Sequence, residues 1–301
     1  MIIVGLDGLD PDLVERWKMD WFKQRSYGRH YVGILSRLCT PLLWGCFLTG
    51  INVEEYGYSY LEFREKKRED AFKSKVLYRL YLLRRRVPLR RLGLRKLLLM
   101  LGLVNPYPPA IMPPHLLKKT FLEELRIKGY SIVAIEVPGY SETKNEYYRC
   151  KLDELVLASF NERSRLIKEA LEDTRERIVK ATTYIREKYD VIFVYSPLPD
   201  LALHLGVNPD LKIKLWLRSI HYSLFRTIQT LLRLAEKEGN IVLIVSDHGF
   251  DIKKYYHSEY GFWSLNIEPP RWWRISSILD FKRNILKLFY ACKNQFRNWK
   301  S

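Results

Sequence analysis

The sequence has few cysteines and no long apolar run, and each shortage argues against a class of protein. Its four cysteines, Cys39, Cys46, Cys150 and Cys292, form no C-x-x-C pair, so neither a disulfide framework nor a thiolate zinc site is indicated. No segment approaches the roughly 20 apolar residues that a membrane-spanning helix needs. The first residues, MIIVGLDG, lack the basic region of a signal peptide. We therefore expect a cytoplasmic protein, with any membrane association confined to the surface.

Acidic residues are in the minority. The 301 residues include 34 Asp and Glu against 51 Lys and Arg, for a formal net charge of +17. Such an excess favours polyanionic partners, namely nucleic acid, an anionic membrane surface or a phosphorylated substrate. Much of the excess lies in residues 84–96, RRRVPLRRLGLRK, and in the chain from Arg271 onward. The charge alone does not choose among these partners.

Short apolar runs alternate with longer amphipathic segments. The runs predict four buried strands, at Ile2–Val4, Ser131–Ile135, Val191–Tyr195 and Ile241–Val245. The longer segments Ser164–Glu187 and Lys212–Glu238 have helical periodicity. Strands that alternate with helices predict an α/β fold, here a three-layer α/β/α sandwich with a central, mainly parallel sheet.

The pattern changes between Phe63 and Pro114, where charge is dense, no strand is indicated and a proline-rich stretch closes the segment. We interpret residues 63–114 as a basic helical insert or cap on a catalytic domain that spans residues 1–270. Residues 271–301 would then form a basic C-terminal tail. Within the insert, LLLMLGLV at Leu97–Val104 indicates either a buried cap helix with a solvated charged face or a surface that contacts a membrane.

Potential metal ligands follow three of the predicted strands. Asp7 comes after the first, Asp200 and His204 follow the third, and Asp247 with His248 follow the fourth in VSDHGF. His257 comes shortly afterwards, in HSEYGF. Taken singly, each has an ordinary explanation: a helix cap, a tight turn or a structural histidine. Together, three Asp and three His can supply two sites of three protein ligands each, and ligands at strand ends are typical of α/β enzymes.

Thr40 is the candidate nucleophile. It precedes Pro41 in CTPLLWGCFLTG, and proline is favoured in the first turn of a helix. The threonine side chain would then lie at a helix N-terminus, where an anion is stabilised. A hydroxyl held there beside a metal can attack phosphorus. The alternative is that Thr40 is merely the helix cap.

With these residues in place, the sequence resembles the type I phosphodiesterase/nucleotide pyrophosphatase family of the alkaline phosphatase superfamily. The resemblance covers most of the chain and rests on segments that occur in the family's order. These segments are GLDGLDPDLVERW, TPLLWGCFLTGINVEEYGY, FLEELRIKGYSIVAIEVPGY, YSPLPDLALHLG, VSDHGF and HSEYGF. Its most specific parts are the Thr-Pro helix start that ends in Thr-Gly, the Asp-x-x-x-His pair and the Ser-Asp-His-Gly turn.

The resemblance implies two divalent metal ions, zinc by preference and manganese or iron as alternatives. Asp200, His204 and His257 match the ligands of one ion. Asp7, Asp247 and His248, with the oxygen of Thr40, match those of the other. Thr40 would form a covalent phosphothreonine that water then hydrolyses. The order Cys39-Thr40-Pro41 is also similar to the sulfatase pattern C-x-P-x-R, but Leu43 stands where that pattern requires arginine.

The sequence therefore favours a metal-dependent phosphoric ester hydrolase of the phosphodiesterase or pyrophosphatase type. The alternative is a basic protein that binds nucleic acid or a membrane surface and retains a vestigial metal site. A complete set of seven ligand groups favours the enzyme. We expect a phosphorylated substrate, and contact of the basic insert with an anionic membrane or nucleic acid is a separate hypothesis.

Overall fold

The structure, a computed structural model, describes residues 1–84, 94–206 and 210–298. Its centre is a six-stranded sheet in the order β2-β8-β5-β1-β4-β3. The strands are β1 (Ile2–Asp7), β2 (Ser26–Tyr31), β3 (Ile132–Ile135), β4 (Val191–Pro199), β5 (Val242–Val245) and β8 (Tyr260–Leu265). β3, β4, β1 and β5 pair in parallel, whereas β8 pairs antiparallel with both β5 and β2. The predicted mainly parallel sheet is confirmed, and the four expected strands are β3, β4, β1 and β5.

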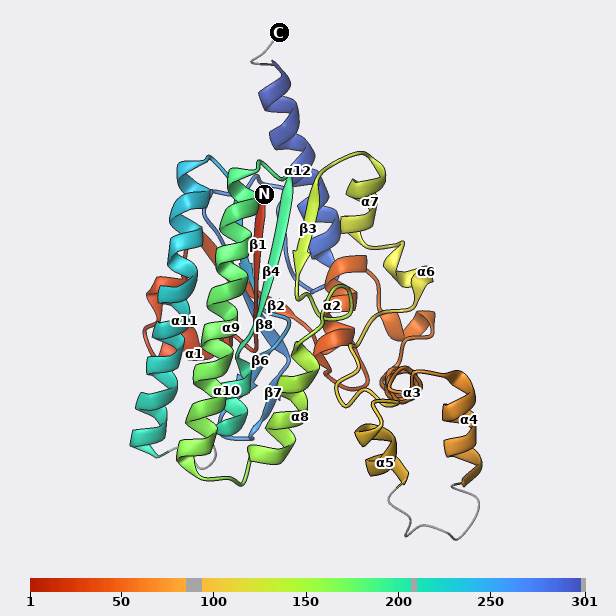
Figure 1. Ribbon diagram of the computed structural model, residues 1–301. Coiled ribbons are helices and arrows are strands. Elements are labelled where there is room, and N and C mark those ends of the chain that lie inside the picture. Colours follow the sequence, from red (N-terminus) through yellow and green to blue (C-terminus); the bar gives the residue numbers. More distant parts are fainter. Residues whose placement is uncertain (85–93, 207–209, 299–301) are drawn as a thin grey trace.

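Helices cover both faces of the sheet, as the sandwich prediction requires (Figure 1). One face packs against α1 (Pro11–Arg16), α9 (Phe160–Arg186) and α11 (Leu211–Lys237), and the other against α2 (Thr40–Thr49), α7 (Phe121–Ile127) and α12 (Asp280–Asn298). Successive side chains of a strand point to opposite faces. Ile2 and Val4 accordingly join the first core and Ile3 joins the second. This two-sided burial explains why the parallel strands read as unbroken apolar runs.

The carboxyl ends of β1, β4 and β5 lie side by side because these strands are parallel neighbours. Four elements begin or lie near that edge. They are the start of α2, α8 (Asn145–Leu155), α10 (Asp200–Leu205) and the hairpin of β6 (Gly249–Asp251) with β7 (Tyr256–Ser258). This edge of the sheet is where the predicted ligands follow their strands.

The predicted insert is largely helical. Its elements are α3 (Tyr60–Asp70), α4 (Lys75–Arg84) and α5 (Leu94–Met100), between the short 3₁₀ helix η2 (Val53–Tyr56) and α6 (Pro114–Leu117). Most of the basic run 84–96 lies outside the described residues, which omit 85–93. In the segment Leu97–Val104, Leu98 and Val104 are buried, but Leu97, Met100 and Leu101 are exposed. The segment thus has both buried and exposed apolar side chains.

The C-terminal segment contains α12, which buries Phe281, Ile285 and Leu288 beside α2. Trp273 and Ile278, from the loop before α12, belong to the same core. The sequence-based expectation did not include the strands β2 and β8, the hairpin β6–β7 or the 3₁₀ helix η1 (Asp20–Phe22). Among the described residues, no helix is both long enough and apolar enough to cross a membrane.

Candidate metal centre

Asp7 lies at the end of β1 and contacts residues from three other elements. The hydroxyl of Tyr195, on β4, donates a hydrogen bond to Asp7 Oδ2. The Thr40 hydroxyl lies 3.5 Å from Asp7 Oδ1, and His248 Nε2 lies 3.2 Å from the same oxygen. Asp7 is buried, with 6% of its surface exposed. It is therefore a central member of the predicted set.

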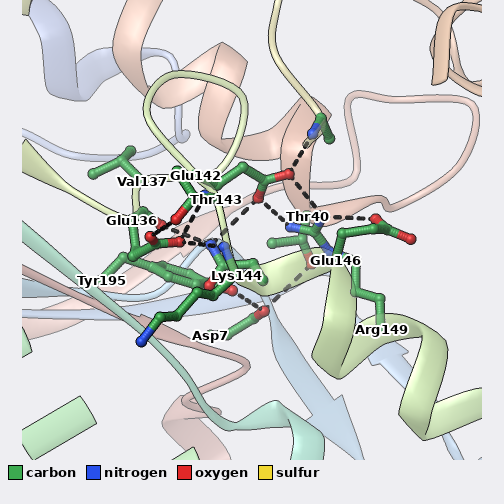
Figure 2. Close-up of polar contacts among 12 residues, drawn as sticks. Asp7, Thr40, Glu136, Val137, Glu142, Thr143, Lys144, Glu146, Arg149 and Tyr195 are labelled. Carbon is green, nitrogen blue, oxygen red and sulfur yellow. Dashed lines mark hydrogen bonds and ion pairs between the residues drawn. The ribbon is translucent and has the colours of Figure 1, made fainter. Parts of the chain in front are cut away.

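Thr40 is the first residue of α2, and Cys39 occupies the N-cap position without a capping bond from its side chain. The structure thus differs from the alternative in which Thr40 itself is the cap. All ten residues of α2 are buried, so the helix is fixed in the core and its first turn has a defined position. The Thr40 hydroxyl is directed to the carboxylate of Asp7 rather than to the helix backbone (Figure 2).

Asp200 is the first residue of the short helix α10, and His204 is its last but one. Their spacing of four residues puts both side chains on one face of the helix, and His204 Nε2 lies 3.5 Å from Asp200 Oδ1. His257, on β7, brings its Nε2 to 3.6 Å from the same oxygen and 2.9 Å from His204 Nε2. Two imidazoles and a carboxylate thus converge from two separate elements.

Asp247 and His248 follow β5 and are fully buried. His248 Nε2 lies 3.6 Å from Asp247 Oδ2, in addition to its contact with Asp7. The turn continues into Gly249, where a Cβ atom would collide with the carboxylate of Asp10. Asp10 needs this close approach because it accepts hydrogen bonds from Phe250 N and Ser258 Oγ. Through these two bonds Asp10 anchors the hairpin that carries His257.

The ligand atoms form two groups. Asp200, His204 and His257 offer atoms that all lie within 4.8 Å of one another, and so do Asp7, Asp200 and His248. Asp200 belongs to both groups, whereas the sequence assigns it to one. Asp247 adjoins the second group through His248 but lies outside the tight cluster. All seven predicted side chains, including Thr40, are therefore at one edge of the sheet.

The unpaired atoms of this site fit divalent cations. Among the described residues, both oxygens of buried Asp247 and Oδ1 of Asp200 have no hydrogen-bond partner. A buried carboxylate oxygen without a hydrogen bond is costly, and coordination of a metal is one way to compensate that cost. Imidazole nitrogens mixed with carboxylate oxygens suit zinc, manganese and iron.

Proton affinities in the site reflect crowding of like charges. Burial, followed by the negative charge of Asp7, raises the pKa of Asp247 well above its usual range, and burial also raises the pKa of Asp200. Burial opposes ionisation of Asp7, but hydrogen bonds from His248 and Tyr195 outweigh it and lower its pKa. Burial and the charges of His248 and His204 lower the pKa of His257. A divalent cation would remove this conflict by displacing protons.

Three further polar residues border the site, and the sequence reasoning missed them. Asn145 and Arg149, from α8, line a small cavity of about 30 Å³ together with Tyr195, Asp7 and Asp200. Tyr195 ends an apolar strand run and α8 resembles a solvated charged helix, so neither gave a signal in the sequence. Only the contact between α8 and the strand ends brings them to the site.

The guanidinium of Arg149 is held by two buried carboxylates. Its Nη2 donates to Glu142 Oε2 at 2.7 Å, and its Nη1 donates to Glu142 Oε1 at 2.9 Å and to Glu146 Oε2 at 3.2 Å. Figure 2 shows Arg149, Glu142 and Glu146 in the same region as Thr40 and Asp7. Arg149 is the cation among the described residues that line the cavity, and its side chain remains 26% exposed.

Cys39 does not have the properties of a nucleophile. Burial raises the pKa of its thiol to about 11, so the thiolate is scarce at neutral pH. The neighbouring Leu43 is fully buried in the core. The sulfatase-like order of residues 39–43 thus lacks both a reactive thiol and the expected arginine.

Comparison of the chain with protein-family models gives no match, and comparison with curated proteins gives none either. Among solved structures, murine ectonucleotide pyrophosphatase/phosphodiesterase 5 is similar at 11% identity with a TM-score of 0.40, over 83% of this chain and 57% of that one. An inactive form of the same protein in complex with AMP is similar at 10% identity with a TM-score of 0.36, over 83% of this chain and 56% of that one. A 2-O GAG sulfatase gives 10% identity and a TM-score of 0.45, over 93% of this chain and 67% of that one.

The chain thus spans little more than half the length of the murine structures. At these identities and scores the comparisons assign neither a family nor an activity to the chain. Its function has to be argued from the side chains at the carboxyl edge of the sheet.

Proposed function

We propose that the protein is a metal-dependent phosphoric ester hydrolase that uses Thr40 as its nucleophile. The observation that carries the proposal is the convergence of six Asp and His side chains at the carboxyl edge of the sheet, where Asp7 lies 3.5 Å from the Thr40 hydroxyl. A protein that only binds a partner has no need of such a set. The substrate class would be phosphodiesters or pyrophosphates.

Two divalent ions, zinc by preference, would be held by Asp200, His204 and His257 and by Asp7, Asp247 and His248 with the Thr40 oxygen. When bound, they would lower the pKa of the threonine hydroxyl and stabilise negative charge on the phosphoryl oxygens. Asp7 orients the hydroxyl, which lies 3.5 Å from Asp7 Oδ1, and Tyr195 fixes Asp7 in turn.

The reaction would proceed by two displacements at phosphorus. In the first, Thr40 Oγ1 forms a bond to phosphorus while the bond to the alcohol or phosphate leaving group breaks. In the second, water attacks the phosphothreonine and releases the phosphoryl product, which restores the hydroxyl. Arg149 would hold a phosphoryl oxygen from the cavity side, because Glu142 and Glu146 fix its guanidinium in one orientation.

Free cysteines at all four positions agree with the proposed cytoplasmic setting.

Metal analysis combined with a substrate screen tests this function. The purified full chain would be loaded separately with zinc, manganese and iron, and assayed on phosphodiesters, pyrophosphates, phosphomonoesters and sulfate esters. We expect turnover of a phosphorus ester with one of these metals, and none of sulfate esters. A protein that binds two metal ions per chain but hydrolyses no phosphorus ester would contradict the proposal.

A further inference from the structure

The insert exposes apolar side chains along α4 and at the end of α5. On α4, Val76, Leu80 and Leu83 are 64%, 56% and 57% exposed, and steps of four and three residues put them on one face of the helix. At the other end of the insert, Leu97, Met100 and Leu101 are 51%, 77% and 62% exposed. We call these six residues the α4–α5 apolar face.

The insert does not use this face for its own packing. Its small core consists of Ala71, Leu98 and Val104, with Phe72, Leu99 and Leu103 packed against them. That core is separate from the two cores of the sheet domain. Single exposed leucines are ordinary, but six large exposed apolar side chains on α4 and at the end of α5 are of the kind that marks an interaction site.

The charge around the apolar face is of one sign. The sequence has no Asp or Glu from Ala71 to Leu122, while residues 73–96 include ten Lys and Arg. Of these, Lys73, Lys75 and Arg79 are exposed in the described part of the insert, next to the α4 stripe. Glu69, near the end of α3, pairs with Lys75 across 3.6 Å. A partner of the complementary kind is both apolar and negatively charged.

The position of the helices leaves the face accessible. In Figure 1, α4 and α5 lie on the far side of α3 from the sheet, and no other labelled helix or strand of the described residues is drawn beyond them. A broad surface could therefore meet both helices without first meeting the α/β body.

We propose that the α4–α5 apolar face docks on an anionic membrane surface. The exposed leucines and methionine would enter the boundary between headgroups and acyl chains, and the lysines and arginine would pair with anionic headgroups. Nucleic acid accounts less well for the same surface, because it would satisfy the cations but leave six large apolar side chains in water. This docking does not depend on the proposed hydrolase activity.

Flotation of the full-length protein with lipid vesicles tests the docking. We expect binding to vesicles that contain phosphatidylglycerol and little binding to pure phosphatidylcholine. The variant Leu80→Ser/Leu83→Ser/Met100→Ser should bind phosphatidylglycerol vesicles about tenfold or more weakly, because three exposed side chains no longer insert. A matched control, Ile127→Ser/Leu157→Ser, removes side chains that are 80% and 91% exposed elsewhere, and it should bind like the wild type.

A charge variant separates the electrostatic contribution to membrane binding from the apolar one. Lys73→Glu/Lys75→Glu/Arg79→Glu should lose most of the preference for phosphatidylglycerol, and rising salt should weaken the wild type in the same direction. Thermal unfolding of every variant checks that the fold is intact.

Three results would overturn the inference. The first is equal flotation of the wild type and the apolar variant. The second is tight binding of single-stranded RNA that the charge variant loses and the apolar variant keeps, which would assign the surface to nucleic acid. The third is a concentration-dependent dimer that the apolar variant abolishes, which would assign it to a second copy of the chain. None of them bears on metal binding or hydrolysis, so the two proposals fail separately.

Discussion

Replacing Asp247 by Asn should have opposite effects on the protein with and without metal. Both oxygens of Asp247 are buried and lack hydrogen-bond partners among the described residues, and its pKa is raised by burial and by Asp7. A carboxyl whose pKa is raised on folding stabilises the fold only below its unfolded value, near 4, and this contribution is lost as the pH rises through the folded value. At neutral pH the side chain therefore destabilises the metal-free fold. The neutral amide removes that cost.

The expected magnitudes follow from linkage. Each unit by which folding raises the pKa costs about 1.4 kcal/mol of stability at higher pH, so the metal-free variant should be more stable by roughly 1–3 kcal/mol. An ion at about 100 times its Kd stabilises the wild type by about 2.7 kcal/mol per site. If loss of one ligand weakens that site about 100-fold, its contribution falls to about 0.4 kcal/mol at the same concentration. For a chain of this size, each kcal/mol corresponds to a shift in Tm of about 2 °C.

Thermal unfolding after chelation and after addition of zinc measures both effects. The variant should melt about 2–6 °C higher than the wild type without metal, and its zinc-induced shift should be about 5 °C smaller. His257→Ala is a matched control, since it weakens the other predicted site without removing a buried carboxylate and should not raise the metal-free Tm. A metal-free Asp247→Asn protein that is less stable than the wild type, with an unchanged zinc shift, would refute the reasoning.

The remaining predictions concern the nucleophile, acid stability and the hairpin. Thr40→Ala should abolish hydrolysis while zinc content by elemental analysis stays above half of the wild-type value, and Thr40→Ser should retain measurable turnover; near-normal rates in Thr40→Ala would show that water attacks phosphorus directly. Burial lowers the pKa of His221 to about 4, so the neutral ring stabilises the fold above pH 6.5 and loses that effect as the pH falls. Between about pH 7.5 and pH 5 the wild type should lose about 2 kcal/mol more than His221→Gln in urea unfolding, and parallel pH curves would contradict this. Gly249→Ala should cost about 1–3 kcal/mol, because the new methyl group meets the carboxylate of Asp10, and zinc titration should show weaker binding at the His257 site. Unchanged zinc affinity in that variant would mean that Asp10 does not position the hairpin.

The parallel strands were predictable from sequence because burial on both faces of β1, β4 and β5 favours runs of mostly apolar residues. β1 and β5 read as unbroken apolar runs for this reason, and the ligands that follow them were predictable with them. β2 gave no such signal, since SYGRHY, at an edge of the sheet, has half-buried and exposed residues and a single buried one, His30. Its pairing with β8 depends on contacts between segments more than 200 residues apart, which local periodicity does not encode.

The α8 side of the site was not predictable for a related reason. Arg149 looks like a surface residue in NEYYRCKLDEL, and it is drawn inward by Glu142 and Glu146, which are themselves buried. Lys67, from the insert, pairs with Glu146 as well, so residues of three segments share one buried charge cluster. A charged residue on a helix can be assigned to an interior only once its partners are known, because isolated charges are not buried.

The two signs of charge are separated in this molecule, and the separation suits the proposed chemistry. The chain as a whole has a net charge of +17, yet the carboxyl edge of the sheet gathers the carboxylates of Asp7, Asp200 and Asp247. A basic exterior raises the local concentration of a phosphorylated substrate over distances of about 10 Å at moderate salt. This acidic site would repel the same substrate unless bound divalent cations made the charge of the site positive. Substrate capture should therefore depend on metal occupancy in addition to the surface charge, with Arg149 as the one fixed cation among the described residues lining the cavity.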